Sequence, residues 1–499
     1  MNLIETFREC ARQSRDLPAV FWGERAYSYN EIDNGAQGLT RRLVIEWAVR
    51  PGDRVGLWLK NCPEFVIAVF GVLGAGAILV PINNFLKPDE VAYILDDAGI
   101  EVLLTDEELG AHEAAIKHRR PSLKVLRLNS LESCQASAPA PPIVMPRAPQ
   151  EPAVIIYTSG TTGHPKGAVL THANLLHNVE SCRQVLAANA QDRMVVILPL
   201  FHSYMLCVGL LLPLLSGGSM ILIKSLHPLK SLLHEIQLHR GTILPAIPQF
   251  YRSLMSLPTL PELPLRLCIS GAAPLPLQFL HEFEAKFGIP LIEGYGLSEA
   301  SPVVAKNPLN GQRKPGSIGL PIPHVEMSVQ DTSGNCLAAG EVGEICVRGG
   351  NVMLGYWRQP EETAKVMRGR WLLTGDMGYH DAEGYYYITD RKKDMLLVNG
   401  MNVYPREIEE VLYQVAGIRE AAVVGLPDPK RGEQPVAFVA AEGPAGLDEQ
   451  RILHFARERL ADYKVPRRIV FVPALPRNAT GKILKTTLRE WARSPHSRP

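Results

Sequence analysis

Short apolar strands alternate with helical stretches between residues 27 and 150, and this alternation limits the folds open to the chain. Residues 53–59 and 77–81 have the apolar composition of strands, and residues 63–73 between them have that of a helix. Strands that alternate with helices predict βαβ units and a largely parallel sheet. Residues 135–150 are rich in Pro and Ala, so we expect a linker or a surface crossing there.

A loop rich in hydroxyls and glycines follows a β-branched run at 153–156, which predicts a buried strand. Residues 157–167 read Tyr-Thr-Ser-Gly-Thr-Thr-Gly-His-Pro-Lys-Gly. The glycines let the backbone turn its N–H groups inward, the hydroxyls add donors and the lysine adds positive charge. These groups favour a polyphosphate-binding loop over a plain turn, although Gly rather than Ser or Thr follows the lysine, unlike in a Walker A motif. The residues concerned are Thr158, Ser159, Gly160, Thr161, Thr162, Gly163 and Lys166.

Two later turns are made of residues small enough for a planar ligand to approach the backbone. One follows a predicted strand that begins at residue 265, and the other follows a strand that begins at residue 291. In the second turn a tyrosine stands between two glycines, so its ring offers a face on which a base can stack. A glycine-flanked tyrosine also marks ordinary turns, so its order after the phosphate loop is what favours a nucleotide site. The residues concerned are Gly271, Ala272, Ala273, Gly294, Tyr295 and Gly296.

Two carboxylates follow glycine turns and are candidates for polar contacts with a nucleotide. Glu299 lies three residues after the second turn and offers an oxygen ligand suited to Mg²⁺, which binds through one or two carboxylates plus phosphates. Asp376 follows Gly375 at the expected end of a strand, where a carboxylate could accept both ribose hydroxyls. An Asp after Gly is also a common turn former, so this alternative stays open.

A run of charged residues divides the chain near its last quarter. Residues 390–394 are all charged and lie between two apolar runs, which fits either a hinge or a solvated hairpin turn. Beyond them, residues 421–426 and 436–440 predict strands and residues 448–460 predict a helix, so a small α/β unit is expected. Lys482 follows a glycine in the basic segment after this unit, and composition alone would suit a solvated tail.

The bulk composition excludes several classes of protein. A length of 499 residues predicts two or more domains, and a formal net charge of +1 provides no field for nucleic acid or acidic membranes. Eight cysteines are scattered without any Cys-x-x-Cys pair, so neither a zinc ribbon nor a disulfide framework is indicated. We therefore expect a reducing, cytoplasmic location.

Two apolar stretches require a decision about membranes. Residues 205–223 contain no charged residue, but Pro213 and the glycines at 217 and 218 interrupt them. We predict a buried helix at 206–215 and a buried strand at 219–223 rather than a span, and residues 66–82 are interpreted in the same way. The charged N-terminal segment, residues 1–10, predicts a short amphipathic helix rather than a signal peptide.

The loop at 157–167 resembles the phosphate loop of adenylate-forming (AMP-binding) enzymes, the superfamily of acyl-CoA synthetases, luciferases and peptide-synthetase adenylation domains. The later motifs follow in the family's order, and residues 316–321 and 402–409 look most like bacterial medium- and long-chain fatty acyl-CoA synthetases. The resemblance implies an α/β fold with a large N-terminal domain of βαβ-built sheets and a small mobile C-terminal α/β domain. It implies residues 1–390 for the large domain, 391–393 for the hinge and 394–499 for the small domain.

The resemblance also implies roles for single residues. Lys482 matches the family's closing Pro-Arg-x-x-x-Gly-Lys motif and would bridge the acyl carboxylate and the α-phosphate of ATP. Thr161 and Glu299 would hold Mg²⁺, and His202 would line the channel to the acyl pocket, unless it is a satisfied core histidine. Ser298 and residues 158–166 would bind phosphate, and Tyr295, with residues 271–273 and the flanking Gly294 and Gly296, would bind adenine. Asp376 and Arg391 would bind the ribose. Lys393 would be the pivot of the hinge, and Gly400 would lie at the CoA tunnel.

The activity implied by the resemblance is ATP-dependent conversion of a carboxylic acid, expected to be a medium- or long-chain fatty acid, into an acyl-CoA thioester. ATP and coenzyme A would be co-substrates, with Mg²⁺ as the metal. Alternatives are an aryl-CoA ligase, a fatty acyl-AMP ligase that loads a carrier protein, and a non-catalytic binder of acyl groups or nucleotides. We expect no transmembrane span, at most peripheral membrane contact, and a monomer or homodimer.

Overall fold

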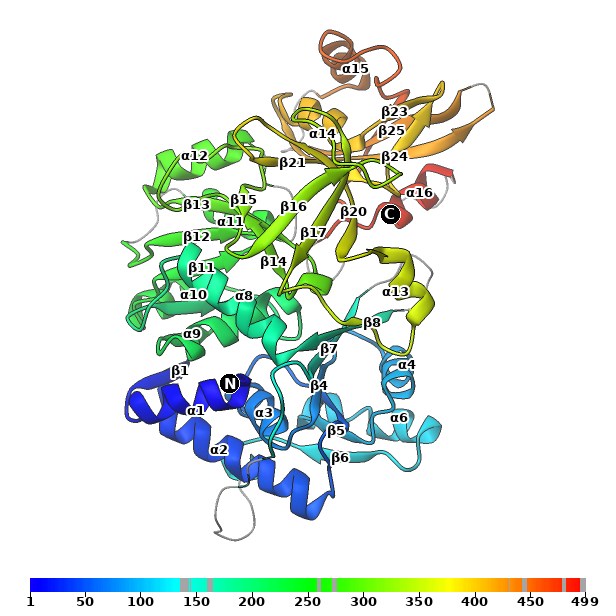
Figure 1. The fold of residues 1–499 in the computed structure, drawn as a ribbon. Coiled ribbons are helices and arrows are strands. Elements are labelled where there is room, and N and C mark those ends of the chain that lie inside the picture. Colours follow the sequence, from blue (N-terminus) through cyan, green and yellow to red (C-terminus); the bar gives the residue numbers. More distant parts are fainter. Residues whose placement is uncertain are drawn as a thin grey trace.

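The computed structural model describes residues 1–134, 143, 145–158, 165–257, 262–271, 275, 277–429, 431–441, 447–477 and 482–493. Its described residues form an α/β protein with four sheets, three in a large N-terminal domain and one in a small C-terminal domain (Figure 1). Most of the predicted linker at 135–150 and residues 159–164 of the phosphate loop lie outside the described residues. Ala272 and Ala273 also lie outside them.

The alternating strands and helices predicted before residue 150 form a sheet that is parallel at its centre. β3 (Arg54–Trp58) lies between β4 (Ile78–Pro81) and β5 (Val102–Thr105), and all three run parallel. α3 (Pro63–Gly74) connects β3 to β4 and is buried along almost its whole length, because it is apolar on nearly every face. These elements confirm the prediction. The sheet continues through β6 (Lys124–Arg127), β7 (Pro152–Thr158), β8 (Lys166–Thr171) and β18 (Gly355–Tyr356).

Helices from the start of the chain cover this sheet. α1 (Leu3–Gln13) confirms the predicted amphipathic helix, and it begins with a capping box in which Asn2 and Glu5 satisfy each other's backbone N–H groups. The apolar side of α1 packs against α2 (Tyr29–Arg41) and α3 in the main core. Smaller elements complete this region: a π-helical turn, η1 (Arg42–Glu46), and the helices α4 (Pro88–Ala98), α5 (Glu107–Gly110), α6 (Glu113–Arg119) and α7 (Leu131–Cys134).

A second sheet carries the predicted nucleotide turns. β11 (Ile243–Ala246), β12 (Leu267–Ser270) and β13 (Leu291–Gly296) run parallel, so their carboxyl ends meet at one edge of the sheet. β14 (Val303–Lys306) returns antiparallel to β13. The remaining strands are β1 (Pro18–Trp22), β2 (Arg25–Ser28), β9 (Arg193–Val196), β10 (Ser219–Leu222) and β15 (Leu320–Pro321). Its helices include α8 (His172–Val185), α10 (Leu229–Leu238), α11 (Pro248–Met255) and α12 (Leu277–Phe287).

The uncharged stretch at 205–223 is buried inside the large domain. It forms a π-helix, η2 (Met205–Leu211), then α9 (Leu212–Leu215) and β10, which confirms the predicted order of helix and strand but not the regular α-helical winding. Every residue of η2 is buried. In the part of the chain that the structure describes, no helix combines the length and apolar character needed to cross a bilayer.

A third sheet joins the large domain to the small one. β20 (Trp371–His380) pairs with β17 (Gly343–Gly349) on one side and with β21 (Tyr386–Arg391) on the other. Asp376 therefore lies inside a strand, and the prediction that it ends one is wrong. Gly375 has φ of 72°, but it sits where the register with β17 shifts, so it makes a bulge that the two neighbouring strands hold in line. The sheet also contains β16 (Val325–Gln330) and β19 (Met367–Arg368).

The small C-terminal domain is a sheet with helices packed on it. Figure 1 shows it in orange and red above the third sheet. β24 (Ile418–Asp428) and β25 (Gly432–Ala441) form its antiparallel centre, and α15 (Glu449–Arg457) follows the N-cap Asp448, as the sequence predicts. Buried apolar side chains lie on both faces of the sheet. The other elements are β22 (Leu396–Val398), β23 (Met401–Val403), β26 (Arg468–Phe471), α14 (Pro405–Tyr413) and α16 (Lys485–Arg493).

Candidate active site

Three predicted nucleotide-binding residues from separate strands meet in one chain of contacts. The Tyr295 hydroxyl, on β13, donates to Asp376 Oδ2 at 2.5 Å, and Arg391 Nε lies 2.7 Å from Asp376 Oδ1. Asp376 on β20 and Arg391 on β21 are paired in register, which fixes the second contact. The Asp376 side chain is 3% exposed, so its charge is compensated in the interior by the arginine. This arrangement presents an aromatic ring, a carboxylate and a guanidinium at one place.

The glycines at this edge are required by close approaches. A Cβ at Gly296 would lie 2.1 Å from the Pro302 carbonyl oxygen, so no side chain fits there. A Cβ at Gly271 would lie 3.3 Å from the Tyr204 ring, which therefore covers the end of β12. Sequence reasoning did not single out Tyr204, because nothing near residue 271 in the sequence indicates it. Gly271 and Gly296 thus stand at neighbouring strand ends, the first against Tyr204 and the second next to Tyr295 in the chain.

Glu299 lies beside the last residue of the strand that precedes the phosphate loop. It stands on a short 3₁₀ turn, η3 (Ser298–Ala300). Its Oε1 accepts a hydrogen bond from the Tyr356 hydroxyl at 2.9 Å and a longer one from Thr158 Oγ1 at 3.5 Å. Both bonds fix one oxygen of the carboxylate, and its Oε2 accepts none from the described residues. One oriented carboxylate oxygen suits Mg²⁺ that takes its other ligands from phosphates and water. Among the described residues, no group of three His, Cys, Asp or Glu could hold a metal on its own.

Lys166 is close to the Glu299 site but is held by a counter-ion. Its ammonium forms an ion pair with Glu362 of α13 (Pro360–Val366) and lies 5.4 Å from the centre of the Tyr356 ring. This bond and a second one from Lys365 lower the pKa of Glu362 to about 2. Ser298, beside Glu299, shares a hydrogen bond of 2.8 Å with the hydroxyl of Ser203. Glu362 and Tyr356 were missed because they lie far along the chain from Lys166 and Glu299.

His202 lies in the protein interior, and its recorded contact is local. Its Nδ1 accepts a long hydrogen bond, 3.3 Å, from the backbone N–H of Tyr204. Burial lowers the pKa of His202 to about 4, so the ring is neutral at physiological pH. Asn61 fixes the preceding turn by bonding both the Leu198 carbonyl and the Leu200 N–H at 2.8 Å. The place of His202 near Tyr204 fits both roles considered for it, lining a channel or being a core histidine with its hydrogen bonds satisfied.

Lys482 approaches the ribose-side charges from the small domain. Its side chain is exposed to solvent, but protein atoms lie close enough around it to affect its charge. This partial burial and, after it, the nearby charge of Arg391 lower the pKa of Lys482 to about 8, while the charge of Asp376 opposes the change. The structure therefore brings Lys482 to the Tyr295–Asp376–Arg391 chain. Lys393 contributes a weaker repulsion from the turn after β21.

Gly400 lies apart from this group, at the turn between β22 and β23. Its φ is 77°, and a Cβ there would meet nothing within 4 Å. In the described part of the chain, the strands on either side of this turn pair with each other and with β25 of the small domain. The structure thus does not bring Gly400 to the nucleotide residues.

Polar contacts connect the small domain to the end of β21. The Arg406 N–H donates to Asp390 Oδ2 at 3.0 Å, and Lys485 Nζ lies 3.9 Å from the same oxygen. Inside the small domain, Arg489 of α16 pairs with Asp394 at 2.6 Å. Asp390 and Asp394 are both buried, so the charged run at 390–394 is not a solvated hairpin turn.

One more contact joins the domains away from the charged run. Arg252 of α11 donates to the Arg419 carbonyl oxygen at 2.8 Å, and its guanidinium lies over the Tyr413 ring at 5.5 Å. These contacts and those at Asp390 define what we call the domain junction. They hold the small domain in the orientation that places Lys482 near Asp376 and Arg391.

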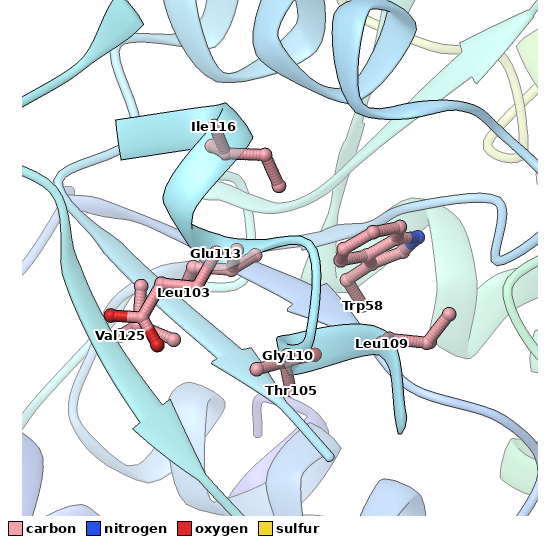
Figure 2. Close-up of a pocket in the computed structure, with 8 residues that line it drawn as sticks. All are labelled: Trp58, Leu103, Thr105, Leu109, Gly110, Glu113, Ile116 and Val125. Atoms are coloured by element: carbon pink, nitrogen blue, oxygen red, sulfur yellow. The ribbon is translucent and has the colours of Figure 1, made fainter. Parts of the chain in front are cut away.

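A small hollow between α5, α6 and the edge of the first sheet lies apart from these residues (Figure 2). It has no room for a water molecule, and mostly apolar side chains such as Trp58, Leu103 and Ile116 line it. The carboxylate at its rim, Glu113, is already paired with Lys117 at 2.7 Å and Arg127 at 3.2 Å. The hollow therefore lacks the convergent polar groups of a substrate site.

Comparison with known proteins gives matches over nearly the whole chain. Residues 7–357 match the AMP-binding enzyme family, and residues 407–482 match the AMP-binding enzyme C-terminal domain. A long-chain-fatty-acid–CoA ligase of Bacillus subtilis is 39% identical over 98% of this chain and 94% of its own length. A feruloyl-CoA synthase of Amycolatopsis is 36% identical over 96% of each. The crystal structure of ATP-bound MatB from Rhodopseudomonas palustris, 32% identical, superimposes with a TM-score of 0.92 over 100% of both chains.

Proposed function

Because this chain belongs to the family of AMP-binding enzymes, we propose that it joins a fatty acid first to the AMP moiety of ATP and then to coenzyme A. The first half-reaction gives an acyl-AMP and pyrophosphate, and the second gives an acyl-CoA thioester and AMP. The observation that carries this proposal is the approach of Lys482 to Asp376 and Arg391. Two anions can react only when positive charge lies between them. A lysine that a separate domain brings to the nucleotide site supplies that charge.

In the first half-reaction the acid's carboxylate attacks the α-phosphorus of ATP, and the bond to pyrophosphate breaks. Both reactants are anions, so they repel each other until positive charge lies between them. The ammonium of Lys482 supplies that charge at the α-phosphate and the carboxylate. The Tyr295 ring stacks on adenine. Asp376 accepts hydrogen bonds from the ribose hydroxyls, and Arg391 orients the Asp376 carboxylate.

Other residues hold the phosphates. Lys166 and the hydroxyls of the 158–166 loop bind the departing pyrophosphate, and Ser298 adds a donor beside them. Glu299, with Thr161, would hold Mg²⁺, and the ion would neutralise charge on the phosphate oxygens. For Lys166 to reach a phosphate, it exchanges its ion pair with Glu362 for one with the nucleotide.

In the second half-reaction the thiol of CoA attacks the acyl carbonyl, and AMP leaves. Lys482 occupies the approach to that carbonyl, so the small domain has to turn away. We assign residues 1–390 to the large domain, 391–393 to the hinge with Lys393 as the pivot, and 394–499 to the small domain. The turn brings the strand at Gly400 to the channel for the pantetheine arm, and His202 lines the acyl side.

The acyl group and the setting form part of the same proposal. The uncharged wall of η2 suits an aliphatic chain, and the identity to a fatty-acid ligase supports it. The match to a feruloyl-CoA synthase and the Tyr204 ring over Gly271 favour an aromatic acid as the second candidate. The eight cysteines are all unpaired, which supports a reducing cytoplasmic setting. We propose a monomer or homodimer.

Pyrophosphate release tests the function. Purified protein with ATP and Mg²⁺ is given octanoate, palmitate, benzoate or ferulate, each with and without CoA. Release with octanoate or palmitate, together with an acyl-CoA product when CoA is present, is the expected result. Release with only the aromatic acids would indicate that the protein is an aryl-CoA ligase instead. ATP that stays intact with every acid would refute the function.

A further inference from the structure

The 158–166 loop is contacted by α4 close to both of its ends. The hydroxyl of Tyr157, the residue before the loop, donates to Asp97 Oδ2 at 2.5 Å. Near the other end, the Pro165 carbonyl oxygen accepts a hydrogen bond of 3.2 Å from the Tyr93 hydroxyl. Tyr93 and Asp97 are four residues apart on α4, so both lie on one face of this helix. A single helix face, next to the end of the β7–β8 pair, therefore contacts the chain on both sides (Figure 1).

The two contacted residues are the chain neighbours of two residues of the candidate site. Thr158 follows Tyr157, and its Oγ1 lies 3.5 Å from Glu299 Oε1. Lys166 follows Pro165 and pairs in register with Thr158 across β7 and β8. A displacement of the chain at either contact would therefore move Thr158 or Lys166 with it.

The Tyr157 side chain is fixed in the direction of α4. Tyr157 pairs in register with Gly167, and a Cβ at Gly167 would lie 3.2 Å from the Tyr157 ring. The ring therefore lies over the glycine, where any other residue would displace it. Burial, and after it the bond to Asp97, raises the pKa of Tyr157, so the hydroxyl keeps its proton and donates it to the carboxylate.

Asp97 is unfavourable for the helix that carries it. It stands in the last turn of α4, where the helix dipole is negative, and that turn contains no basic residue. Its neighbour Asp96 is exposed and pairs with Arg120 at 2.8 Å. Asp97 is half-buried, and its recorded hydrogen bond is the one from Tyr157. The contact across to β7 thus compensates for a carboxylate that α4 alone does not favour.

We propose that Asp97 and Tyr93 of α4 position Thr158 and Lys166 for the β- and γ-phosphates of ATP. This inference rests on the proposed function and extends it to a helix outside the nucleotide motifs. Asp97 acts through Tyr157, and Tyr93 acts through the Pro165 carbonyl, so both are positioning residues. AMP lacks the two outer phosphates, so its binding should not depend on these contacts.

The test compares the affinities for ATP and AMP. Both are measured by calorimetric titration with Mg²⁺ and without an acid, so that no turnover occurs. In Asp97→Ala and in Tyr157→Phe, ATP affinity is expected to fall about tenfold while AMP affinity stays at the wild-type value. The double variant should fall no further than either single one, because the two residues act through one bond. Asp97→Asn keeps an acceptor oxygen and should restore most of the ATP affinity, and Tyr93→Phe should show a smaller loss.

The control is Tyr29→Phe, which removes a buried hydroxyl that donates to the Gly218 carbonyl at 2.7 Å in the core. It should lower the urea midpoint of unfolding but leave both affinities unaltered. The inference is overturned if ATP and AMP affinities fall together in Asp97→Ala and Tyr157→Phe, or if neither affinity changes. If those two variants do not fold, an unchanged ratio of the affinities in Tyr93→Phe overturns it equally. Wild-type protein that binds no ATP would refute the proposed function as well, whereas an unchanged ratio in the variants refutes this inference alone.

Discussion

The protonation of Lys482 should control the first half-reaction in a pH range that is open to experiment. An ordinary lysine keeps its charge up to about pH 10. Partial burial, with the charge of Arg391, lowers the pKa of Lys482 to about 8. Because the charged form is the one that joins the two anions, adenylation should weaken as the pH rises through this value. The perturbation is therefore a simple titration from pH 7 to pH 9.

The size of the effect follows from the same pKa. An amine with a pKa of about 8 is protonated in about nine molecules of ten at pH 7 and in about one of ten at pH 9. The kcat/KM for ATP reports the free enzyme and should fall about tenfold across this range. The kcat reports the complex, in which the bound phosphates raise the pKa of Lys482, so its fall should begin at higher pH.

The assay is pyrophosphate release without CoA, which removes the titrating thiol from the reaction. Lys482→Arg keeps a positive charge throughout the range, so its profile should be flat even if its rate is lower. Lys306, the last residue of β14, has a pKa that burial lowers to about 7, so it also titrates near this range. Lys306→Met is therefore measured beside the wild-type protein and should retain the wild-type slope with an acid that has one carboxyl group. A wild-type profile that is flat from pH 7 to 9, or a slope that persists in Lys482→Arg, would refute the assignment.

Three further predictions concern the same framework. Lys482→Ala should abolish adenylation but leave thioester formation from supplied acyl-AMP largely intact, and equal loss of both half-reactions would contradict its role. Asp376→Asn should weaken ATP binding by roughly 10- to 100-fold in a calorimetric titration, because a charged acceptor beside Arg391 is lost; unchanged affinity would exclude a ribose contact. Tyr251→Phe should lower the free energy of unfolding by about 1–3 kcal/mol in urea, since its hydroxyl bonds the Leu244 carbonyl at 2.6 Å and the Ile269 N–H at 3.0 Å in the core. An unchanged unfolding midpoint would contradict that estimate.

The pattern of apolar residues predicted the elements that are packed on all sides. The strands at 53–59 and 77–81 and the helix between them lie where periodicity places them, because burial on every face makes each residue apolar. Local patterns failed at Asp376, where Gly375 indicates a turn. Pairing of β20 on both sides, a non-local effect, keeps the strand continuous through the bulge.

The candidate site shows the same division. The motifs identify Tyr295 and Glu299 because glycines and strand ends flank them. The partners of these residues are set by tertiary contacts, and no sequence spacing indicates that Tyr356 bonds Glu299 or that Glu362 pairs with Lys166. Lys306 is a related case. A single lysine at the end of an apolar run predicts that the strand reaches solvent there, but the structure buries this residue.

The domain junction is built from carbonyl oxygens, carboxylates and basic side chains. When the small domain leaves, water can replace each of these partners, so departure need not expose a large hydrocarbon surface. At ordinary ionic strength dissolved ions screen attractions between exposed charges more than about 10 Å apart, and they screen buried contacts such as those of Asp390 much less. We therefore expect the electrolyte to act mainly on the approach of the two domains when they are apart and their charges are exposed, and to act less on the closed junction itself.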